Sequence, residues 1–334
     1  MSVADHGLEQ IASVIRASYD LGDVETPRVL EKAHQRRHRK MVVESSAGKF
    51  LAKTYRNELA IMDALRFQQH LVTHLIDNGL PVPRIQLTRD GRGVVQVDNW
   101  ALELQEYIEH NIMPMNTKTL TLSARALGRF HKVCEGVPSP PRDVDVWRFS
   151  EVPRIAFQKL YQQARKEADE AEVNKHCNTI ALFLLEAAKA LSPQQRGQFE
   201  TGLIHGDWHS GNLLYREDEL IAIIDLEFAG AGCYLEDIAY AMSNLCVRTS
   251  VDARKLHARA NMLLDNYQLS RSLSYTELVA LFYAVGVKHV TTVAYQAPEH
   301  GGTVAGYTAS QWMERLALQC QWLEEQSRKA RWGG

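Results

Sequence analysis

Three side chains suited to metal and phosphate chemistry lie close together in the stretch from residue 203 to 230, LIHGDWHSGNLLYREDELIAIIDLEFAG. Asp207 and Asn212 follow an apolar pair at 203–204, and Asp225 stands at the end of the apolar run Leu220–Ile224. These runs predict short buried strands, and polar groups at the ends of buried strands are costly unless they hold something. Oxygen ligands of this kind suit a hard cation that is itself bridged to phosphate.

The same side chains could divide the work of phosphoryl transfer between them. One aspartate and Asn212 could share a Mg²⁺ ion, which keeps waters and takes its remaining ligands from substrate phosphates. The other aspartate could accept the proton of an attacking hydroxyl. The reaction otherwise needs positioning and positive charge on the phosphates. Lys53 is the candidate for that charge.

Lys53 lies in the half of the chain that predicts a small antiparallel sheet. Met41–Val43 and Phe50–Tyr55 predict the two arms of a hairpin. A long helix is expected over 57–78, where Asn78-Gly79 gives a C-cap signal. The other elements expected in this half are a helix at 7–20 and strands at 28–32, 85–88, 93–97 and 100–108.

The second half predicts mostly helices around the short β element at 203–225. Their apolar residues recur at three- and four-residue steps. The expected helices cover 119–134, 150–166, 168–191, 235–245, 251–267, 274–294 and 309–329. The fold class is therefore α+β: an N-terminal antiparallel sheet with one long helix, then a larger and mainly α-helical C-terminal part. Joined to a β-rich half that carries Lys53, the central stretch has the layout of a two-lobed kinase.

Composition sets the outer limits of the prediction. The 334 residues suffice for two lobes with substantial cores, and a net charge of −2 favours neither nucleic acid nor an anionic membrane as a partner. We count no apolar run long enough to span a membrane, and MSVADHGLEQ lacks the features of a secretory signal. Five scattered cysteines without CxxC spacing predict reduced thiols in a cytoplasmic protein.

The motifs also carry a resemblance to a known family. H-G-D-W-H-S-G-N-L-L followed by I-I-D-L-E-F-A-G resembles the signature of the aminoglycoside phosphotransferase/choline kinase-like family, whose members are small-molecule kinases with a protein-kinase-like fold. Leu127–His131 is similar to that family's LGxLH helix, and Tyr234–Ala239 to its "DLA" segment. Phe50–Tyr55 resembles its lysine-bearing strand, and Asn78–Pro83 the end of its long helix. Together these motifs cover roughly residues 28–245.

The resemblance implies a role for each residue of the central stretch. Asp207 would be the catalytic base, and Asn212 and Asp225 would hold Mg²⁺. His205 would brace the catalytic loop from within the protein, and Asp237 would brace it through hydrogen bonds.

For the nucleotide, the resemblance implies a lobe at residues 1–108, a hinge at about 105–111 and a catalytic, substrate-binding lobe at 112–334. Lys53 would contact the α- and β-phosphates of ATP. The hinge strand, Gln105–Ile108, would meet the adenine through backbone groups, with Glu106 and Ile108 as the binding residues.

This sequence departs from the family pattern in two places. The family has a glutamate on the long helix that pairs with the strand lysine, and counting back from Gly79 places that position at Gln68; Asp63 or Glu58 takes the role if the register differs. The loop expected to cover the phosphates, residues 35–39, is basic instead of glycine-rich, so its arginines could meet phosphates directly. These arginines are Arg36, Arg37 and Arg39.

Several further assignments stay open. Glu227 lies two residues after Asp225, which on a strand would put it on the same face as a second metal ligand. His209 is a possible loop brace. An amino alcohol or amino sugar as substrate would favour carboxylates in the pocket, and Glu227, Glu236 and the acidic run 167–172 could supply them. An acidic helix start is also ordinary dipole complementation.

The sequence thus predicts an ATP-dependent phosphotransferase that acts on a hydroxyl of a small molecule, with segment 140–190 as a lid or wall. A protein Ser/Thr kinase of the same family is the second hypothesis, and an ATP-binding pseudokinase is the third. The cofactors expected are ATP and Mg²⁺. No nucleic acid or membrane partner is expected, and the oligomeric state is not predicted.

Overall fold

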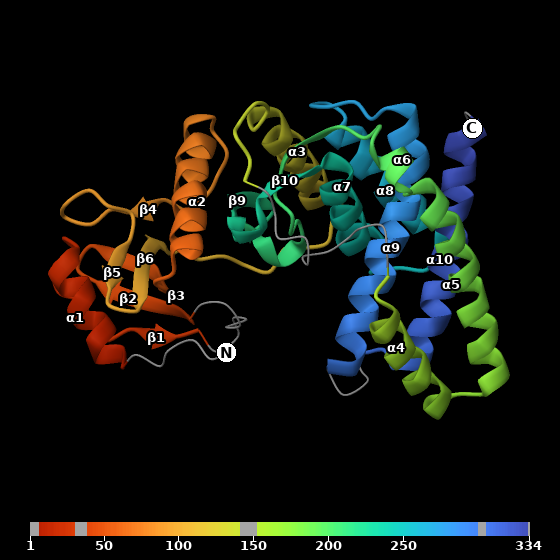
Figure 1. Cartoon of the computed structure of the whole chain (residues 1–334), viewed down its shortest axis with the longest axis horizontal. Helices are drawn as coiled ribbons and strands as arrows, with labels where there is room; N and C mark the ends of the chain where they lie inside the picture. The colour runs from red at the N-terminus through yellow and green to blue at the C-terminus, as the bar shows by residue number, and fades with distance from the viewer. Residues whose placement is uncertain (1–6, 31–38, 141–151, 300–304, 333–334) are drawn as a thin grey trace. The chain divides into compact units, whose positions relative to one another are not determined.

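The chain folds into two compact units. The computed structural model describes residues 7–30, 39–140, 152–299 and 305–332. The first unit comprises residues 1–112 and 214–227, and the second comprises residues 113–213 and 228–334 (Figure 1). Residues 35–38 of the predicted phosphate loop, with Arg36 and Arg37, lie outside the described residues, and so does 141–151 of the proposed lid.

A six-stranded antiparallel sheet is the centre of the first unit. Its strands run in the order β1-β2-β3-β6-β4, and β5 also pairs with β6. The elements of this unit are α1 (Leu8–Ser18), β1 (Arg28–Val29), β2 (Arg39–Ser45), β3 (Gly48–Arg56), α2 (Leu59–Asp77), β4 (Ile85–Gln86), β5 (Val95–Val97), β6 (Trp100–Glu106) and β9 (Glu219–Ile223), with most of β8 (Leu213–Arg216). The β2–β3 hairpin and the long helix occur where the sequence predicts them.

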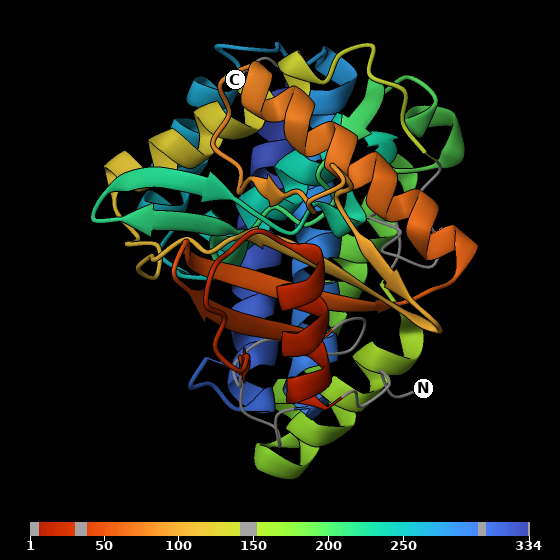
Figure 2. The ribbon, with the colours of Figure 1, turned by 90° about the vertical axis from the view of Figure 1, so that its left-hand side faces the viewer.

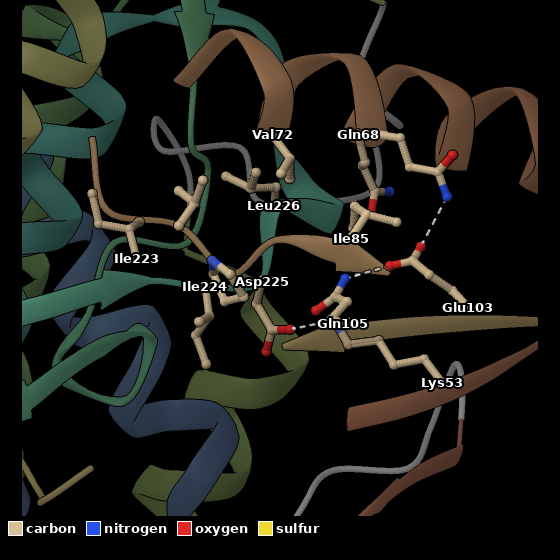
Figure 3. Close-up of a pocket in the computed structure, with 13 residues that line it drawn as sticks. Lys53, Gln68, Val72, Ile85, Glu103, Gln105, Ile223, Ile224, Asp225 and Leu226 are labelled. Carbon is tan, nitrogen blue, oxygen red and sulfur yellow. Dashed lines mark hydrogen bonds and ion pairs between the residues drawn. The ribbon is translucent and has the colours of Figure 1, made fainter. Parts of the chain in front are cut away.

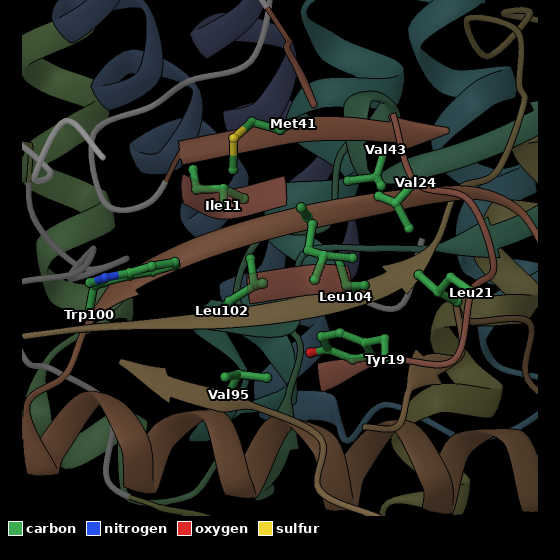
Figure 4. Close-up of a cluster of buried hydrophobic side chains, with 12 residues drawn as sticks. Ile11, Tyr19, Leu21, Val24, Met41, Val43, Val95, Trp100, Leu102 and Leu104 are labelled. Atoms are coloured by element: carbon green, nitrogen blue, oxygen red, sulfur yellow. The ribbon is translucent and has the colours of Figure 1, made fainter. Parts of the chain in front are cut away.

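The two faces of this sheet are covered by different helices. Helix α1 lies across one face (Figure 2), where Ile11 and Ile15 pack in a buried cluster with Leu102 and Leu104 of β6 (Figure 4). Side chains alternate along a strand, so Ala101 and Glu103 point to the other face. There Ala101 packs against Met62 and Leu65 of α2. Lys53 lies opposite Glu103 in the β3–β6 register, so both charged side chains lie on the α2 face of the sheet.

The second unit is mainly helical. Its elements are α3 (Thr117–Val133), α4 (Arg154–Glu167), α5 (Glu170–Ala190), α6 (Pro193–Arg196), β7 (Thr201–Ile204), a 3₁₀ turn η1 (Ser210–Asn212), β10 (Gly230–Cys233), α7 (Tyr234–Met242), a π-helical segment η3 (Ser243–Val247), α8 (Ala253–Tyr267), α9 (Tyr275–Glu299) and α10 (Ala309–Trp332). Helix α9 packs against α4, α5, α7 and α10 (Figure 1). The sequence predicts seven of these α-helices, with ends that differ by a few residues, and does not predict the short helix α6.

Helix α9 corrects one expectation from composition. Residues Tyr275–Gln296 are long and apolar enough to cross a membrane, with a mean hydropathy of 1.4 over the most apolar window. That window is 83% buried inside the fold, which is typical of the core helix of a globular unit. The sequence interpretation missed it because Lys288 and His289 interrupt the apolar run; both are buried.

Two short strands of the second unit, β7 and β10, flank the central stretch. Strand β7 pairs antiparallel with β10, with Ile204 opposite Gly230. The loop after β7 and the turn before β10 therefore lie at the same end of the ribbon. All five cysteines are free thiols, as expected.

Candidate functional site

The loop after β7 holds Asp207 in a fixed position. Gly206 has φ +80°, and a Cβ there would lie 2.5 Å from the carbonyl oxygen of Phe228, so only glycine fits this turn. Asn212 folds back in the 3₁₀ turn, and its Nδ2 donates to both the backbone oxygen and Oδ2 of Asp207, each at 2.9 Å. Asp207 and Asn212, which are five residues apart in the sequence, are thus in direct contact.

His209 and Tyr240 surround the same carboxylate. His209 Nε2 lies 3.3 Å from Asp207 Oδ2, and the Tyr240 hydroxyl also hydrogen-bonds the Asp207 side chain. Burial raises the pKa of Asp207, but the hydrogen bond and charge of His209, with His205 and Tyr240, outweigh it and lower the pKa to about 2. Asp207 is therefore ionised at neutral pH and can accept a proton only from a group that is losing one.

Asp237 holds the loop from below through three hydrogen bonds. Its Oδ2 accepts from the backbone N–H of His205 at 2.7 Å and from His131 Nε2 at 3.0 Å, and its Oδ1 accepts from the backbone N–H of Gly206 at 2.8 Å. Asp237 is 1% exposed. Although burial raises its pKa, these donors hold the pKa of Asp237 below its usual value. Such a carboxylate fixes the backbone on which Asp207 stands.

His205 is fully buried beside this network. Its Nδ1 accepts a hydrogen bond from the backbone N–H of Asp207 at 3.2 Å, and its ring meets Trp208 edge-on with 5.4 Å between ring centroids. The Trp208 indole in turn donates to Ser123 Oγ at 3.1 Å. The structure thus places His205 and Asp237 inside the fold beneath the loop, and Trp208 in the core.

A second group of charged side chains lies in the first unit, on the α2 face of the sheet. Lys53 is 7% exposed, and its Nζ lies 3.5 Å from Asp225 Oδ1. Lys40 approaches the same carboxylate at 2.8 and 3.0 Å. Asp225 follows β9 with φ +59°, a left-handed conformation that aspartate tolerates better than most residues. The carboxylate of Asp225 is therefore held by two ammonium groups.

Glu103 is the residue that the sequence interpretation missed. It is 1% exposed and faces Lys53 across the β3–β6 pair. Burial raises the pKa of Glu103, while the charge of Lys53 and hydrogen bonds from Gln105 and Gln69 oppose this. Its signal in the sequence was a lone glutamate inside the apolar strand 100–104, but only the strand register identifies the lysine beside it.

The three candidates for the partner of Lys53 lie elsewhere on or beside α2. Gln68 lines the same pocket as Lys53, but the hydrogen bond of Lys53 goes to Asp225. Asp63 and Glu58 are exposed and pair with Arg66 and Arg56. Within the described residues, the carboxylates identified next to Lys53 are thus that of Glu103, which is buried, and that of Asp225, which is 18% exposed.

These side chains line a pocket of the first unit (Figure 3). Its walls come from β3, α2, β4, β6 and the segment after β9. Its polar lining residues are Lys53, Gln68, Gln69, Glu103, Gln105 and Asp225, and its apolar ones are Val72, Val82, Pro83, Ile85, Ile223, Ile224 and Leu226. An apolar wall beside a lysine is suited to a flat ring that carries an anionic chain.

The predicted hinge follows β6. The backbone N–H of Glu106 donates to Arg84 O at 2.8 Å, and the carbonyl of Ile108 meets His110 Nδ1 at 2.8 Å. The N–H of Glu106 and the carbonyl of Ile108 are therefore already hydrogen-bonded within the protein.

The argument that placed Glu227 on the same strand face as Asp225 is wrong. Strand β9 ends at Ile223, and residues Leu226–Phe228 form a 3₁₀ turn. The alternation of strand side chains therefore does not apply to this pair.

The other carboxylates offered for a substrate amine serve the helix ends of the second unit. Glu236 accepts from the backbone N–H of Cys233 at 3.0 Å, and Asp169 caps α5. Glu167 accepts from the backbone N–H of Ser310 at 2.8 Å. Ordinary capping and dipole complementation accounts for these groups.

Comparison with known proteins places the chain in a family of phosphotransferases. A family model described as "Phosphotransferase enzyme family" matches residues 30–270. The homoserine kinase of Nitrobacter winogradskyi is 24% identical over 279 residues, which cover 83% of this chain and 80% of that protein. The homoserine kinase of Methylobacterium nodulans is 25% identical over 240 residues, 72% of this chain and 70% of that protein.

Solved structures share the fold. An aminoglycoside phosphotransferase from Alicyclobacillus acidocaldarius matches with a TM-score of 0.65 and 15% identity, covering 96% of this chain and 95% of that one. An amicoumacin kinase in complex with AMP-PNP and Ca²⁺ gives 0.63 and 15%, covering 97% and 94%. A microcompartment-associated aminopropanol kinase gives 0.61 and 19%, covering 97% and 98%. The predicted α+β kinase-like fold is thus confirmed.

Proposed function

Because the chain belongs to the phosphotransferase enzyme family, it is a kinase, and we propose that it moves the γ-phosphate of ATP to a hydroxyl of a small molecule. The observation that carries the proposal is the state of Asp207. Its carboxylate is ionised, partly exposed, and held by Asn212 and His209 above a buried Asp237. A fixed, ionised carboxylate of this kind suits the acceptor of a hydroxyl proton.

The proposed nucleotide site is the pocket of the first unit, whose walls come from a nucleotide lobe of residues 1–108 and from residues 223–226. Lys53 would contact the α- and β-phosphates, with Glu103 as the counter-charge that keeps its chain extended. Since the N–H of Glu106 and the carbonyl of Ile108 are already hydrogen-bonded, adenine would meet the carbonyl of Glu106 and the N–H of Ile108. Gln68 would line the pocket beside the phosphates.

The donor set fits a divalent cation. The amide nitrogen of Asn212 is committed to Asp207, which leaves its carbonyl oxygen as the atom for a metal. Asp225 is an anion held by two ammonium groups, which a cation could replace. Oxygen ligands of this type suit Mg²⁺, so we assign Asn212 and Asp225 to it; bound there, it would neutralise charge on the β- and γ-phosphates. Glu227 remains a candidate as an additional ligand.

In the catalytic lobe, residues 112–334, the acceptor oxygen attacks the γ-phosphorus as the bond from that phosphorus to the β–γ bridging oxygen breaks. The acceptor proton passes to Asp207, and ADP leaves with the bridging oxygen. His209 and Asn212 orient the carboxylate, and Asp237 and His205 fix the backbone beneath it. Positioning of this kind supplies much of the rate in phosphoryl transfer.

The proposed acceptor is a small alcohol. Relatives named homoserine kinase and a structural neighbour named aminopropanol kinase support a short hydroxylated chain. The free cysteines support the proposed cytoplasmic location.

The test is ADP release from MgATP in a panel of amino alcohols, hydroxy acids, amino sugars and nucleosides, with a casein-type protein substrate and the chain alone as further samples. We expect rates with at least one small alcohol to be far above the rate without acceptor. Phosphate transfer to protein alone, or nucleotide binding without turnover on any acceptor, would refute the proposal.

A further inference from the structure

Two cationic side chains lie beside Tyr240 in the second unit, and a third, that of Arg315, contacts the backbone of one of them. Lys288 of α9 places its Nζ 3.7 Å from the centroid of the Tyr240 ring and is 5% exposed. Arg248 follows the π-helical segment η3, and its charge lies close enough to interact with Tyr240. Arg315 of α10 donates to the carbonyl of Arg248 at 3.4 Å. Three separate elements thus converge on one cationic cluster, which we define as Arg248, Lys288 and Arg315.

Tyr240 joins this cationic cluster to the proposed proton acceptor. Its hydroxyl hydrogen-bonds the Asp207 carboxylate, while its ring carries Lys288 and lies near Arg248. One tyrosine side chain therefore spans the distance between Asp207 and the cations. A group bound by the cationic cluster would be a short chain away from a hydroxyl at Asp207.

The two arginines of the cluster are held by neutral groups. Arg248 donates to Gln296 Oε1 at 2.6 Å, and Arg315 stacks on Tyr307 at 4.1 Å from the ring centroid. Among the described side chains, which do not include those of residues 297–304, neither arginine forms an ion pair with a carboxylate, and the buried Nε of Arg315 has no hydrogen-bond partner. His289 adds no counter-charge, because burial lowers its pKa to about 4 and keeps it neutral.

Such an arrangement is costly without an anion. Half-buried cations lose hydration that neutral acceptors replace only in part, and burial lowers the pKa of Arg248 for this reason. Arginine also offers a planar fork that matches a carboxylate. The same charges would repel a polycationic amino sugar.

We propose that Arg248, Lys288 and Arg315 bind a carboxylate of the acceptor, so that the substrate is a short hydroxylated acid, such as a hydroxyamino acid, whose hydroxyl meets Asp207. This inference rests on the proposed function. It replaces the acidic pocket that the sequence suggested with a basic one, and it assigns the specificity of the reaction to α9, α10 and the turn after η3.

The test compares alcohols that differ only by the carboxylate. The pairs are homoserine with 3-aminopropan-1-ol, serine with 2-aminoethanol, and 4-hydroxybutyrate with propan-1-ol. ADP release gives kcat/KM for each, and the measured quantity is the ratio of acid to decarboxylated alcohol. We expect the wild-type ratio to exceed about tenfold for the best pair, because a hydrogen-bonded charge pair is worth at least that much.

Arg248→Gln and Arg315→Gln should each lower this ratio about tenfold, mainly through KM of the acid. Arg248→Lys should have an intermediate effect, since it keeps the charge and loses the fork. Arg328→Gln is the matched control: it lies on the same helix as Arg315, is 63% exposed, and should leave the ratio within twofold of wild type. Thermal melting checks that each variant is folded.

Wild-type ratios near one, or ratios that all three cluster variants leave unchanged, would overturn the inference. If the wild type phosphorylates neither member of any pair, calorimetric titration replaces turnover, and equal or absent binding of acid and alcohol also overturns it. Binding of MgATP, measured separately with a fluorescent analogue, distinguishes this failure from that of the proposed function. Absence of MgATP binding would refute the proposed kinase function. MgATP binding together with equal rates for an acid and its decarboxylated alcohol would refute only the proposed carboxylate subsite.

Discussion

Asp237 offers the most direct test of how the catalytic loop is held. Its two oxygens accept three hydrogen bonds in a site that is 1% exposed. In Asp237→Asn one oxygen becomes an NH₂ group, which can only donate. The less costly orientation turns this NH₂ group toward the N–H of Gly206, so that two donors face each other and this hydrogen bond is lost. The hydrogen bonds from His205 N–H and His131 Nε2 remain, but their acceptor is now a neutral oxygen.

The magnitude follows from these bonds. A hydrogen bond to a charged group contributes about 1.5–3 kcal/mol, and an unsatisfied buried donor costs about 1–3 kcal/mol. Since the three terms share one carboxylate and are not additive, we expect a total loss of about 3–5 kcal/mol in the stability of the loop. Turnover should fall roughly 100-fold, because a displacement of Asp207 by about 1 Å has that effect.

Hydrogen exchange of the amides of His205 and Gly206 is the assay. A loss of 3–5 kcal/mol corresponds to exchange that is about 150- to 5,000-fold faster when the loop opens by itself. Glu236→Gln is the matched control, because it neutralises the adjacent carboxylate, which caps only the start of α7; its effect should stay below tenfold.

The pH dependence has a defined sign. The pKa of Asp237 is lowered in the folded protein, so its stabilisation is present above its unfolded pKa and is lost as the pH falls through the folded value. Wild type and Asp237→Asn should therefore differ by a constant amount at pH 6–8 and converge in acid. Exchange rates in Asp237→Asn no faster than in Glu236→Gln would refute this account of the loop.

Two further substitutions test other parts of the structure. Glu103→Gln removes a buried carboxylate whose pKa is raised by burial. A raised folded pKa means that stability is lost as the pH rises through it, so the melting temperature of the variant should gain on that of wild type as the pH rises above the ordinary glutamate value. KM for ATP should rise about tenfold, because Lys53 loses its counter-charge. Glu9→Gln, an exposed change in the same unit, should do neither, and a Glu103→Gln variant that matches it would exclude the proposed pairing of Glu103 with Lys53. Gly206→Ala should lower the thermal stability by about 2–4 kcal/mol and abolish most turnover, because its methyl group would meet Phe228 O, whereas Gly136→Ala, at φ +77° with open space around it, should cost only about 1 kcal/mol; equal losses in the two alanine variants would contradict the steric argument.

The sequence predicted well where the chemistry is local. The family resemblance rested on motifs within short windows, and the family match supports it. Gly206 next to Asp207 indicated a special turn, and the five-residue spacing to Asn212 allowed the contact that the structure contains. The β2–β3 hairpin with Lys53, and the long helix after it, followed from turn chemistry and periodicity.

The sequence predicted poorly where distant segments meet. Lys40 and Lys53 reach Asp225 from 185 and 172 residues away, and Glu103 lies beside Lys53 only because β3 pairs with β6 in one particular register. Glu227 was misplaced because a 3₁₀ turn follows β9 instead of more strand. The residues of the cationic cluster come from the turn after η3, from α9 and from α10. No local pattern in the sequence indicates that these three segments pack together.

The central claim is that Asp207 accepts the proton in phosphate transfer and has no part in holding the nucleotide. The most direct measurement is transfer from MgATP to the best acceptor alcohol by Asp207→Ala, together with the affinity of the same variant for MgATP. The account predicts that transfer falls at least about 1,000-fold, as for loss of a general base with its positioning role, while the affinity for MgATP stays within about threefold. Turnover near the wild-type rate would contradict it.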